Sequence, residues 1–357
     1  MKHALFGLAL TAVLAAAGPA SQASAADKPL EGVTLRVATF GGAWRDDQTK
    51  YIVPKLEELG AKVEYVVGSP QDNLAKLIAA RGQAPFDVLE ILDASVDMLS
   101  QAGVLEPIDY SIVTNASALT AAQKRPDVVP YWITQEVICY DKAKFDELGL
   151  PAPTTYADLA NPKLAGHVMI PDIASGGGLA NFAGVVYAAG GDVNNVAPAF
   201  DILNKIEGLK FWKAGGQVVT GFNTGDIYAA VAHTGWCLRS ARGANKEILS
   251  AFPKIGDSHE GVAKYGYLGV VKGSPAVKAA MMYINGALDV DYQVAFASHS
   301  GVVPVIPAAV ERLAQEAPEF MALSRMKPEE IDRLLVVDYA GVDVSTWYDQ
   351  WNRKVAQ

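Results

Sequence analysis

The sequence has few cysteines and lacks the spaced clusters of residues that bind metals. It contains two cysteines, Cys139 and Cys237, and five histidines. No C-x-x-C pair occurs, which excludes a thioredoxin-like redox site and a zinc ribbon. No H-x-x-x-H or H-E-x-x-H spacing places two histidines on one helix face. We therefore expect no metal and no cofactor. For the two cysteines, a disulfide and a pair of buried thiols both remain open.

Long apolar runs are also missing beyond the first residues of the chain. Residues 1–25 carry Lys2, an apolar run, and Ala23 and Ala25 in the A-x-A arrangement of a cleavage site. We interpret this segment as a cleavable signal peptide. No later stretch of about 18 apolar residues could span a bilayer. No cysteine stands at the cleavage position to accept a lipid. The sequence thus predicts an exported protein of the bacterial periplasm.

Basic residues are fewer than acidic residues in this chain. The chain has 30 Lys and Arg against 39 Asp and Glu, a formal net charge of −9 at pH 7. This balance argues against nucleic acid or an anionic membrane surface as the partner. The 357 residues exceed what one hydrophobic core usually supports, so we expect two lobes.

Strand-like and helical segments alternate in the first third of the chain. Apolar runs at 34–40, 61–67 and 86–92 are separated by segments with helical spacing. This alternation predicts parallel strands in a doubly wound α/β sheet. The helix before the third run is expected to open at Asp72, and Pro54 to kink or divide the earlier helix.

A second series of strands begins near residue 138. We expect further strands at 167–172, 227–236 and 265–271, followed by mostly helical structure. In open parallel sheets, ligands bind beyond the carboxyl ends of the strands. Those ends read "FGGAW", "DAS", "DIASGGG" and "WCLR" in this chain. The candidate site is therefore expected at strand ends of both halves, as in a cleft between lobes.

The glycine cluster in "SGGGLAN" (175–181) fits neither nucleotide-binding motif. A P-loop requires Lys and Ser or Thr after its last glycine, where Leu and Ala stand, and G-x-G-x-x-G requires a glycine at Asn181. What remains is a helix start with Ser175 as its expected N-cap. Free backbone N–H groups and the helix dipole there suit a carboxylate, phosphonate or sulfonate. A turn that only caps a buried helix is the alternative.

Aromatic and charged residues at the other strand ends allow two interpretations each. Phe40 and Trp44 could line the binding site of an apolar ligand, or they could be packing residues of the lobes. Arg239, three residues after a tryptophan and just past an expected strand end, could clamp a carboxylate or be a surface arginine. Asp93 and Glu136 could each hold an ammonium group. No G-x-S-x-G elbow is present, although a Ser, His and Asp triad could still converge from distant positions.

The order of these segments resembles a known family. The runs "LRVATFGGAW", "FDVLEILDASVDMLSQAGVLEPID", "VICYDKAKFDELGLPAPTTYADLANPKLAGHVMIPD" and "VVDYAGVDVSTWYDQWNRKV" are similar to extracellular solute-binding proteins of ABC importers, in the branch of the spermidine- and putrescine-binding proteins. The resemblance implies the type II periplasmic binding fold, in which two α/β lobes close on a solute about a two-strand hinge. It implies crossings near residues 136–140 and 262–268, with C-terminal helices packed on the first lobe. The lobes would comprise residues 26–136 plus 265–357, and residues 137–264.

The family's contact positions, taken with the candidates above, give one expected ligand-binding set. It consists of Phe40, Gly42, Trp44, Asp93, Gln135, Glu136, Ser175, Gly176, Gly177, Trp236, Arg239 and Tyr265.

One departure from the branch bears on the ligand. Similar polyamine binders carry Trp and Asp on the returning strand, but this strand reads "KYGYLGVV", with no acid. We therefore expect an anionic or zwitterionic solute, such as an ω-amino acid or a small carboxylate. A monomer would deliver it, without chemistry, to an inner-membrane ABC permease. A polyamine-binding protein, a secreted enzyme on the same scaffold and a solute sensor are the alternatives.

Overall fold

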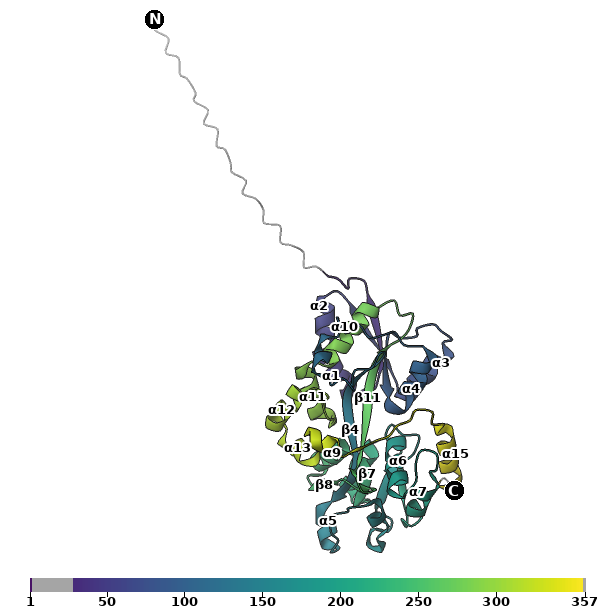
Figure 1. Cartoon of the computed structure of the whole chain (residues 1–357). Helices are drawn as coiled ribbons and strands as arrows, with labels where there is room; N and C mark the ends of the chain where they lie inside the picture. Colours follow the sequence, from purple (N-terminus) through teal and green to yellow (C-terminus); the bar gives the residue numbers. More distant parts are fainter. Residues whose placement is uncertain (2–27, 356–357) are drawn as a thin grey trace.

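The computed structural model describes residue 1 and residues 28–355 (Figure 1). The interpretation of residues 1–25 as a signal peptide thus falls, apart from residue 1, outside the described residues. Within the described part, no helix is long and apolar enough to cross a membrane. The α/β class expected from the sequence is confirmed, because one large mixed sheet carries helices on both faces.

The large sheet contains ten strands. They are β1 (Thr34–Thr39), β2 (Lys62–Val67), β3 (Val88–Leu92), β4 (Val129–Asp141), β5 (Val168–Pro171), β6 (Lys210–Trp212), β7 (Ala229–His233), β8 (Ile248–Ala251), β11 (Val262–Val270) and β12 (Leu335–Val336). A separate antiparallel pair is formed by β9 (Lys254–Ile255) and β10 (His259–Glu260).

Helices connect these strands and cover the sheet. They are α1 (Ala43–Tyr51), α2 (Val53–Glu58), α3 (Pro70–Ala79), α4 (Asp93–Ala102), α5 (Lys142–Glu147), α6 (Gly178–Ala188), α7 (Ala197–Leu203), α8 (Gly216–Thr224), α9 (Thr234–Ala244), α10 (Val277–Ala287), α11 (Val290–Ser300), α12 (Pro307–Glu316), α13 (Pro318–Leu323), α14 (Pro328–Ile331) and α15 (Val344–Lys354).

The sheet consists of two parallel blocks joined by two long antiparallel strands. The strand order is β2-β1-β3-β11-β4-β7-β5-β6. Strands β1, β2 and β3 pair in parallel, as do β5, β6 and β7. Between the blocks, β11 and β4 run antiparallel to each other and to their outer neighbours. In Figure 1, β4 and β11 run between the two lobes, with β1–β3 in the first lobe and β5–β7 in the second.

The strand register brings the carboxyl ends of both blocks together. Leu92, the last residue of β3, pairs with Gly266, which also pairs with Trp132 on β4. His233, the last residue of β7, pairs with Glu136. Because β3 runs with β4 and β7 runs against it, the two blocks point toward each other. Their carboxyl ends meet along the short stretch of β4 between Trp132 and Glu136.

Three local expectations can be compared with these bounds. Pro54 lies in the first turn of α2, so the prediction that it starts a second helical segment is confirmed. The helix expected to open at Asp72 begins at Pro70. Ser69 caps it and Asp72 completes the capping box as the third residue. The strand expected over 227–236 ends at His233, whose Nδ1 accepts the Gly235 N–H and caps α9.

The two cysteines form a disulfide between β4 and α9. Cys139 and Cys237 have Cα atoms 5.3 Å apart and close a loop of 98 residues. In the chain-entropy model, a loop of this length restricts the unfolded chain by about 4 to 5 kcal/mol. The bond therefore ties α9 to one of the strands that join the lobes.

The C-terminal helices divide between the lobes. Helices α10 and α11 pack on α2 and α1 of the first lobe, whereas α13 packs on α9. Helix α15 packs on the second lobe, where the Trp351 ring lies 5.3 Å from Phe182 and 5.6 Å from Phe211. The expectation that the C-terminal helices pack on the first lobe is wrong for α13, which contacts α9 of the second lobe, and for α15, because its indole rings complete a core of the second lobe. The proposed lobe boundaries stay a prediction.

Candidate functional site

A cavity of about 200 Å³ lies where strand ends of the two lobes meet. Helices α3 and α4 of the first lobe form one wall, and α6 and α15 form the other. Its polar and ionisable lining residues are Gln71, Asp93, Ser95, Ser175, Lys264 and Tyr348. Of the residues expected from the sequence, Asp93, Ser175 and Gly176 line it.

The glycine-rich loop forms the second-lobe side of the cavity. Helix α6 begins at Gly178 with Gly177 as its N-cap, so the prediction that Ser175 is the N-cap is wrong. The chain turns tightly before this start, because a Cβ added at Gly178 would collide with the Ile173 carbonyl oxygen. No side chain caps this helix, and the Ser175 hydroxyl is buried without a hydrogen-bond partner among the described residues. The loop thus offers unused donors beside the cavity.

Asp93 forms the first-lobe side of the cavity. It follows β3 directly and is the first residue of α4. Its Oδ1 accepts the Ala94 N–H at 2.8 Å, and its Oδ2 accepts the Tyr265 N–H at 3.4 Å. Burial raises the pKa of the Asp93 carboxyl to about 6, although the charge of Lys264 opposes the rise. Among the described residues, Asp93 forms no ion pair within 4.0 Å.

Glu136 is the second acid expected to face the ligand, but its carboxylate is bonded to other side chains of the protein. It is fully buried. Its Oε1 accepts the Thr134 hydroxyl at 2.8 Å and lies 3.5 Å from Lys264 Nζ, and its Oε2 accepts the Asn181 amide at 2.5 Å. Such a carboxylate has both oxygens satisfied and has little capacity left for a ligand.

Lys264 is a central residue of the cavity that the sequence reasoning missed. Its ammonium donates to the Gly176 carbonyl at 2.9 Å and lies 5.6 Å from the centre of the Trp132 ring. The side chain is 8% exposed. A sequence signal existed, because Lys264 is the one charged residue of the apolar strand "VAKYGYLGV". A lysine in a buried strand needs acceptors nearby.

Gln135 and Tyr265 do not present side chains to the same cluster. Alternation along β4 places Gln135 on the face opposite Glu136. There its amide accepts the Arg325 N–H and donates to the Arg325 carbonyl. Tyr265 takes part through its backbone N–H, which bonds Asp93. Its ring lies 6.2 Å from that of Tyr267.

The first glycine-rich loop leads into an aromatic cluster. Gly42 is the N-cap of α1 at φ 64°, a conformation that favours glycine. The Trp44 ring lies 5.3 Å from Phe40, 5.6 Å from Trp132 and 4.4 Å from Phe296. These contacts support the interpretation of Trp44 as a packing residue.

Trp236 and Arg239 lie in the first two turns of α9. The expected strand does not reach Trp236, because β7 stops at His233, so Arg239 lies within a helix and not just past a strand end. The Arg239 guanidinium stacks 3.6 Å above the Trp236 ring and donates to the carbonyls of Gly235 and Ser300. Burial lowers its pKa to about 10. Arg239 thereby joins α9 to the end of α11, and this use competes with a role as a carboxylate clamp.

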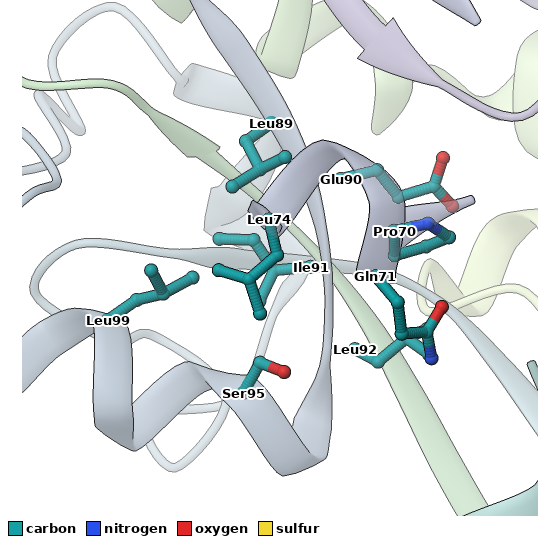
Figure 2. Close-up of a pocket in the computed structure, with 9 residues that line it drawn as sticks. All are labelled: Pro70, Gln71, Leu74, Leu89, Glu90, Ile91, Leu92, Ser95 and Leu99. Carbon is teal, nitrogen blue, oxygen red and sulfur yellow. The ribbon is translucent and has the colours of Figure 1, made fainter. Parts of the chain in front are cut away.

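Behind the first-lobe wall lies a second, much smaller cavity of about 10 Å³ (Figure 2). Leu74 and Leu99 line it, and in Figure 2 the Glu90 carboxyl points away from them. This space is at most that of one water molecule. A solute therefore has room in the larger cavity and not in this one. Within residues 28–355 no group of three or more His, Cys, Asp or Glu is placed to hold a metal ion.

Comparison with known proteins agrees with this architecture. The family model of the bacterial extracellular solute-binding proteins matches residues 50–322. A putative spermidine/putrescine ABC transporter protein from Listeria monocytogenes has a TM-score of 0.72 and 20% identity, covering 91% of this chain and 99% of its own. The periplasmic binding protein AgtB from A. tumefaciens R10, in complex with agropinic acid, has a TM-score of 0.69 and 22% identity, covering 91% and 99%.

A third solved structure, the Atu4243 GABA receptor, has a TM-score of 0.69 and 18% identity, covering 89% of this chain and 94% of its own. At these identities the three structures show a shared fold. The family model spans well over half of the 357 residues. By that match, and in agreement with the cavity between two α/β lobes, this chain belongs to the bacterial extracellular solute-binding proteins.

Proposed function

We propose that this protein is the periplasmic receptor of an ABC importer and that its solute carries one ammonium and one carboxylate group, as an ω-amino acid does. The observation that carries the proposal is that one wall of the cavity presents an acid and the opposite wall presents hydrogen-bond donors. Asp93, an acid without an ion-pair partner in the described chain, lies on the first-lobe wall. The uncapped start of α6 and the Ser175 hydroxyl lie on the second-lobe wall.

Each wall suits one end of such a solute. An ammonium beside Asp93 would supply the missing counter-charge to a carboxyl already held by two backbone N–H groups. A carboxylate at the start of α6 would accept free N–H groups and meet the positive end of the helix dipole. Because the two walls belong to different lobes, one solute would contact both and favour the closed arrangement.

The size of the cavity also limits the solute. Sites for drug-sized ligands usually measure about 300–1,000 Å³. The cavity here, about 200 Å³, suits a smaller molecule. The GABA receptor with the same fold supports this choice, since GABA has an amine and a carboxylate at opposite ends. Delivery to an inner-membrane permease, without chemistry, is part of the proposal, and a monomer suffices for it.

A polyamine is the second candidate, because one neighbour of the same fold is a putative spermidine/putrescine transporter protein. The cavity argues against it. A diamine needs two anionic positions, and the Glu136 carboxylate is already bonded by Thr134, Asn181 and Lys264. That leaves Asp93 alone for two ammonium groups.

A calorimetric titration of the purified mature protein tests the proposal. The panel contains γ-aminobutyrate, butyrate, butylamine and putrescine, which share one carbon chain and differ in their end groups. We expect γ-aminobutyrate or a homologue of different length to bind, and the three compounds that lack one of the two charges to bind at least about tenfold more weakly. Tightest binding of putrescine would overturn the zwitterion. Recovery of chemically altered solute would overturn the transport role in favour of an enzyme.

A further inference from the structure

The ammonium of Lys264 occupies a site built from other parts of the chain. Lys264 belongs to β11, which returns from the second lobe to the first. Its Nζ lies 2.9 Å from the Gly176 carbonyl oxygen and 3.5 Å from Glu136 Oε1. The Trp132 ring faces it at 5.6 Å. A carbonyl, a carboxylate and an indole face are the groups that bind alkylammonium ligands.

The acceptors of this site are held in place independently of Lys264. Thr134 and Asn181 each donate to Glu136, one to each carboxylate oxygen. Trp132 is fixed by a hydrogen bond from its Nε1 to Glu90 at 3.1 Å. The Lys264 side chain is 8% exposed and Glu136 is fully buried, so bulk water screens the pair weakly. An ammonium-binding site therefore exists next to the cavity, and the protein's own side chain fills it.

We propose that Lys264 is a specificity-determining residue, a built-in ammonium that occupies the second cation position of the cleft and thereby excludes diamines. The inference rests on the proposed function, in which Asp93 receives the one ammonium of the solute. A diamine would have to place its second ammonium beside Lys264, where like charges repel at short range. Exclusion by repulsion is a common way to obtain specificity between similar ligands.

Removal of the Lys264 side chain tests the inference. The Lys264→Ala variant leaves Glu136, the Gly176 carbonyl and the Trp132 ring around an unfilled space. We expect putrescine and propylamine, titrated calorimetrically, to bind this variant at least about tenfold more tightly than they bind the wild-type protein. The same amines should raise the melting temperature of the variant and leave that of the wild-type protein unchanged.

A matched double variant assigns the gain to the site described. In Lys264→Ala/Glu136→Gln the space is the same, but the carboxylate is neutral, so the gain in amine binding should disappear. If Lys264→Ala does not fold, Lys264→Gln supplies a neutral amide that can still donate to Gly176 and Glu136. Its ratio of putrescine to γ-aminobutyrate affinity should rise by about tenfold over the wild-type ratio. An unchanged ratio, or a gain that survives Glu136→Gln, would overturn the inference.

The proposed function is tested on the wild-type protein and the role of Lys264 on its variants, so the two failures can be distinguished. The proposed function fails if the wild-type protein prefers putrescine to every amino acid of the panel. The role of Lys264 fails if its variants keep the wild-type preference, whatever that preference is. The amine titrations of Lys264→Ala need no knowledge of the natural solute.

Discussion

Two glycine-rich loops follow strands of the sheet, and the structure uses them differently. The loop at 40–44 leads into α1, and the loop at 172–178 leads into α6. The first is closed by aromatic packing, since Trp44 contacts rings from β4 and α11. The second opens on a cavity, with a helix start that no side chain caps. Similar sequences at strand ends thus serve packing in one lobe and, as we propose, ligand binding in the other.

The largest effect is expected from a side chain added to the second loop. A Cβ at Gly176 meets no atom within 4 Å, so Gly176→Val should fold, and its isopropyl group should occupy part of the cavity that Gly176 lines. We expect the affinity for the best amino acid of the panel to fall by about 100-fold, or about 3 kcal/mol, with little change in the free energy of unfolding. Calorimetry and urea unfolding measure the two quantities.

Gly216→Val is the matched control for this substitution. Gly216 is the first residue of α8, whereas Gly176 lies two residues before α6. Both have open space around an added Cβ, but Gly216 does not line the cavity. We expect it to leave the affinity unchanged. Equal affinities of the Gly176→Val variant and the wild-type protein would show that the loop leads into α6 without contacting the ligand.

The first loop should respond in the opposite way. Trp44→Ala removes ring contacts with Phe40, Trp132 and Phe296 and a hydrogen bond to the Tyr131 hydroxyl. We expect urea unfolding to show a loss of about 2 kcal/mol in the free energy of unfolding, below the usual value for a fully buried Trp because Trp44 is half-buried. The affinity of the folded protein should change less than threefold. A large loss of affinity with intact stability would make Trp44 a ligand contact instead.

The fold was more predictable from the sequence than the site, for physical reasons. Strand and helix periodicity is a local property, and the runs at 34–40, 61–67 and 86–92 became β1, β2 and β3. The function of Glu136 depends on Thr134, Asn181 and Lys264, which three different elements bring together. No local sequence pattern indicates that these side chains come into contact. It is decided by the register of β4 against β11, in which Lys264 pairs with Thr134.

The helix at 234–244 shows the same limit on a smaller scale. The apolar run before it favoured a strand through Trp236. The chain turns into α9 after His233 because a histidine ring accepts a backbone N–H there. Burial lowers the pKa of His233 well below its usual value, so the ring is neutral and its Nδ1 is free to accept. A side-chain cap of this kind is uncommon and was not expected from residue preferences.

The acids beside the two loops should titrate differently. Near the first loop, the buried Asp47 is bonded to His299 Nδ1 at 2.8 Å. Near the second, the donors to Asp93 within residues 28–355 are backbone N–H groups only, and burial raises its pKa to about 6. A solute ammonium needs the ionised form. Affinity for an ω-amino acid should therefore fall by about tenfold from pH 7 to pH 5, and Asp93→Asn should bind weakly at both pH values. A pH-independent affinity of the wild-type protein would contradict this assignment.

The same raised pKa has a consequence for stability. The folded protein holds the Asp93 proton more tightly than the unfolded chain does, so ionisation of Asp93 destabilises the fold at pH values above about 6 and not below about 4. At pH 7 the Asp93→Asn variant should gain about 1 to 2 kcal/mol in the free energy of unfolding. This is less than the full shift implies, because the carboxyl is partly open to the cavity.

The smallest effect is expected from removal of the Ser175 hydroxyl, which belongs to the second loop. Ser175→Ala removes a buried hydroxyl that has no partner among the described residues, so stability should stay the same or rise slightly. If the hydroxyl donates to the solute carboxylate, affinity should fall about fivefold, or about 1 kcal/mol. Ser240→Ala is the matched control, because the Ser240 hydroxyl in α9 is also buried and has no partner in the described part of the chain, but lies outside the cavity. Equal affinities of the two variants in calorimetry would exclude the Ser175 hydroxyl from the contact and leave the backbone N–H groups of α6 as the donors to the carboxylate.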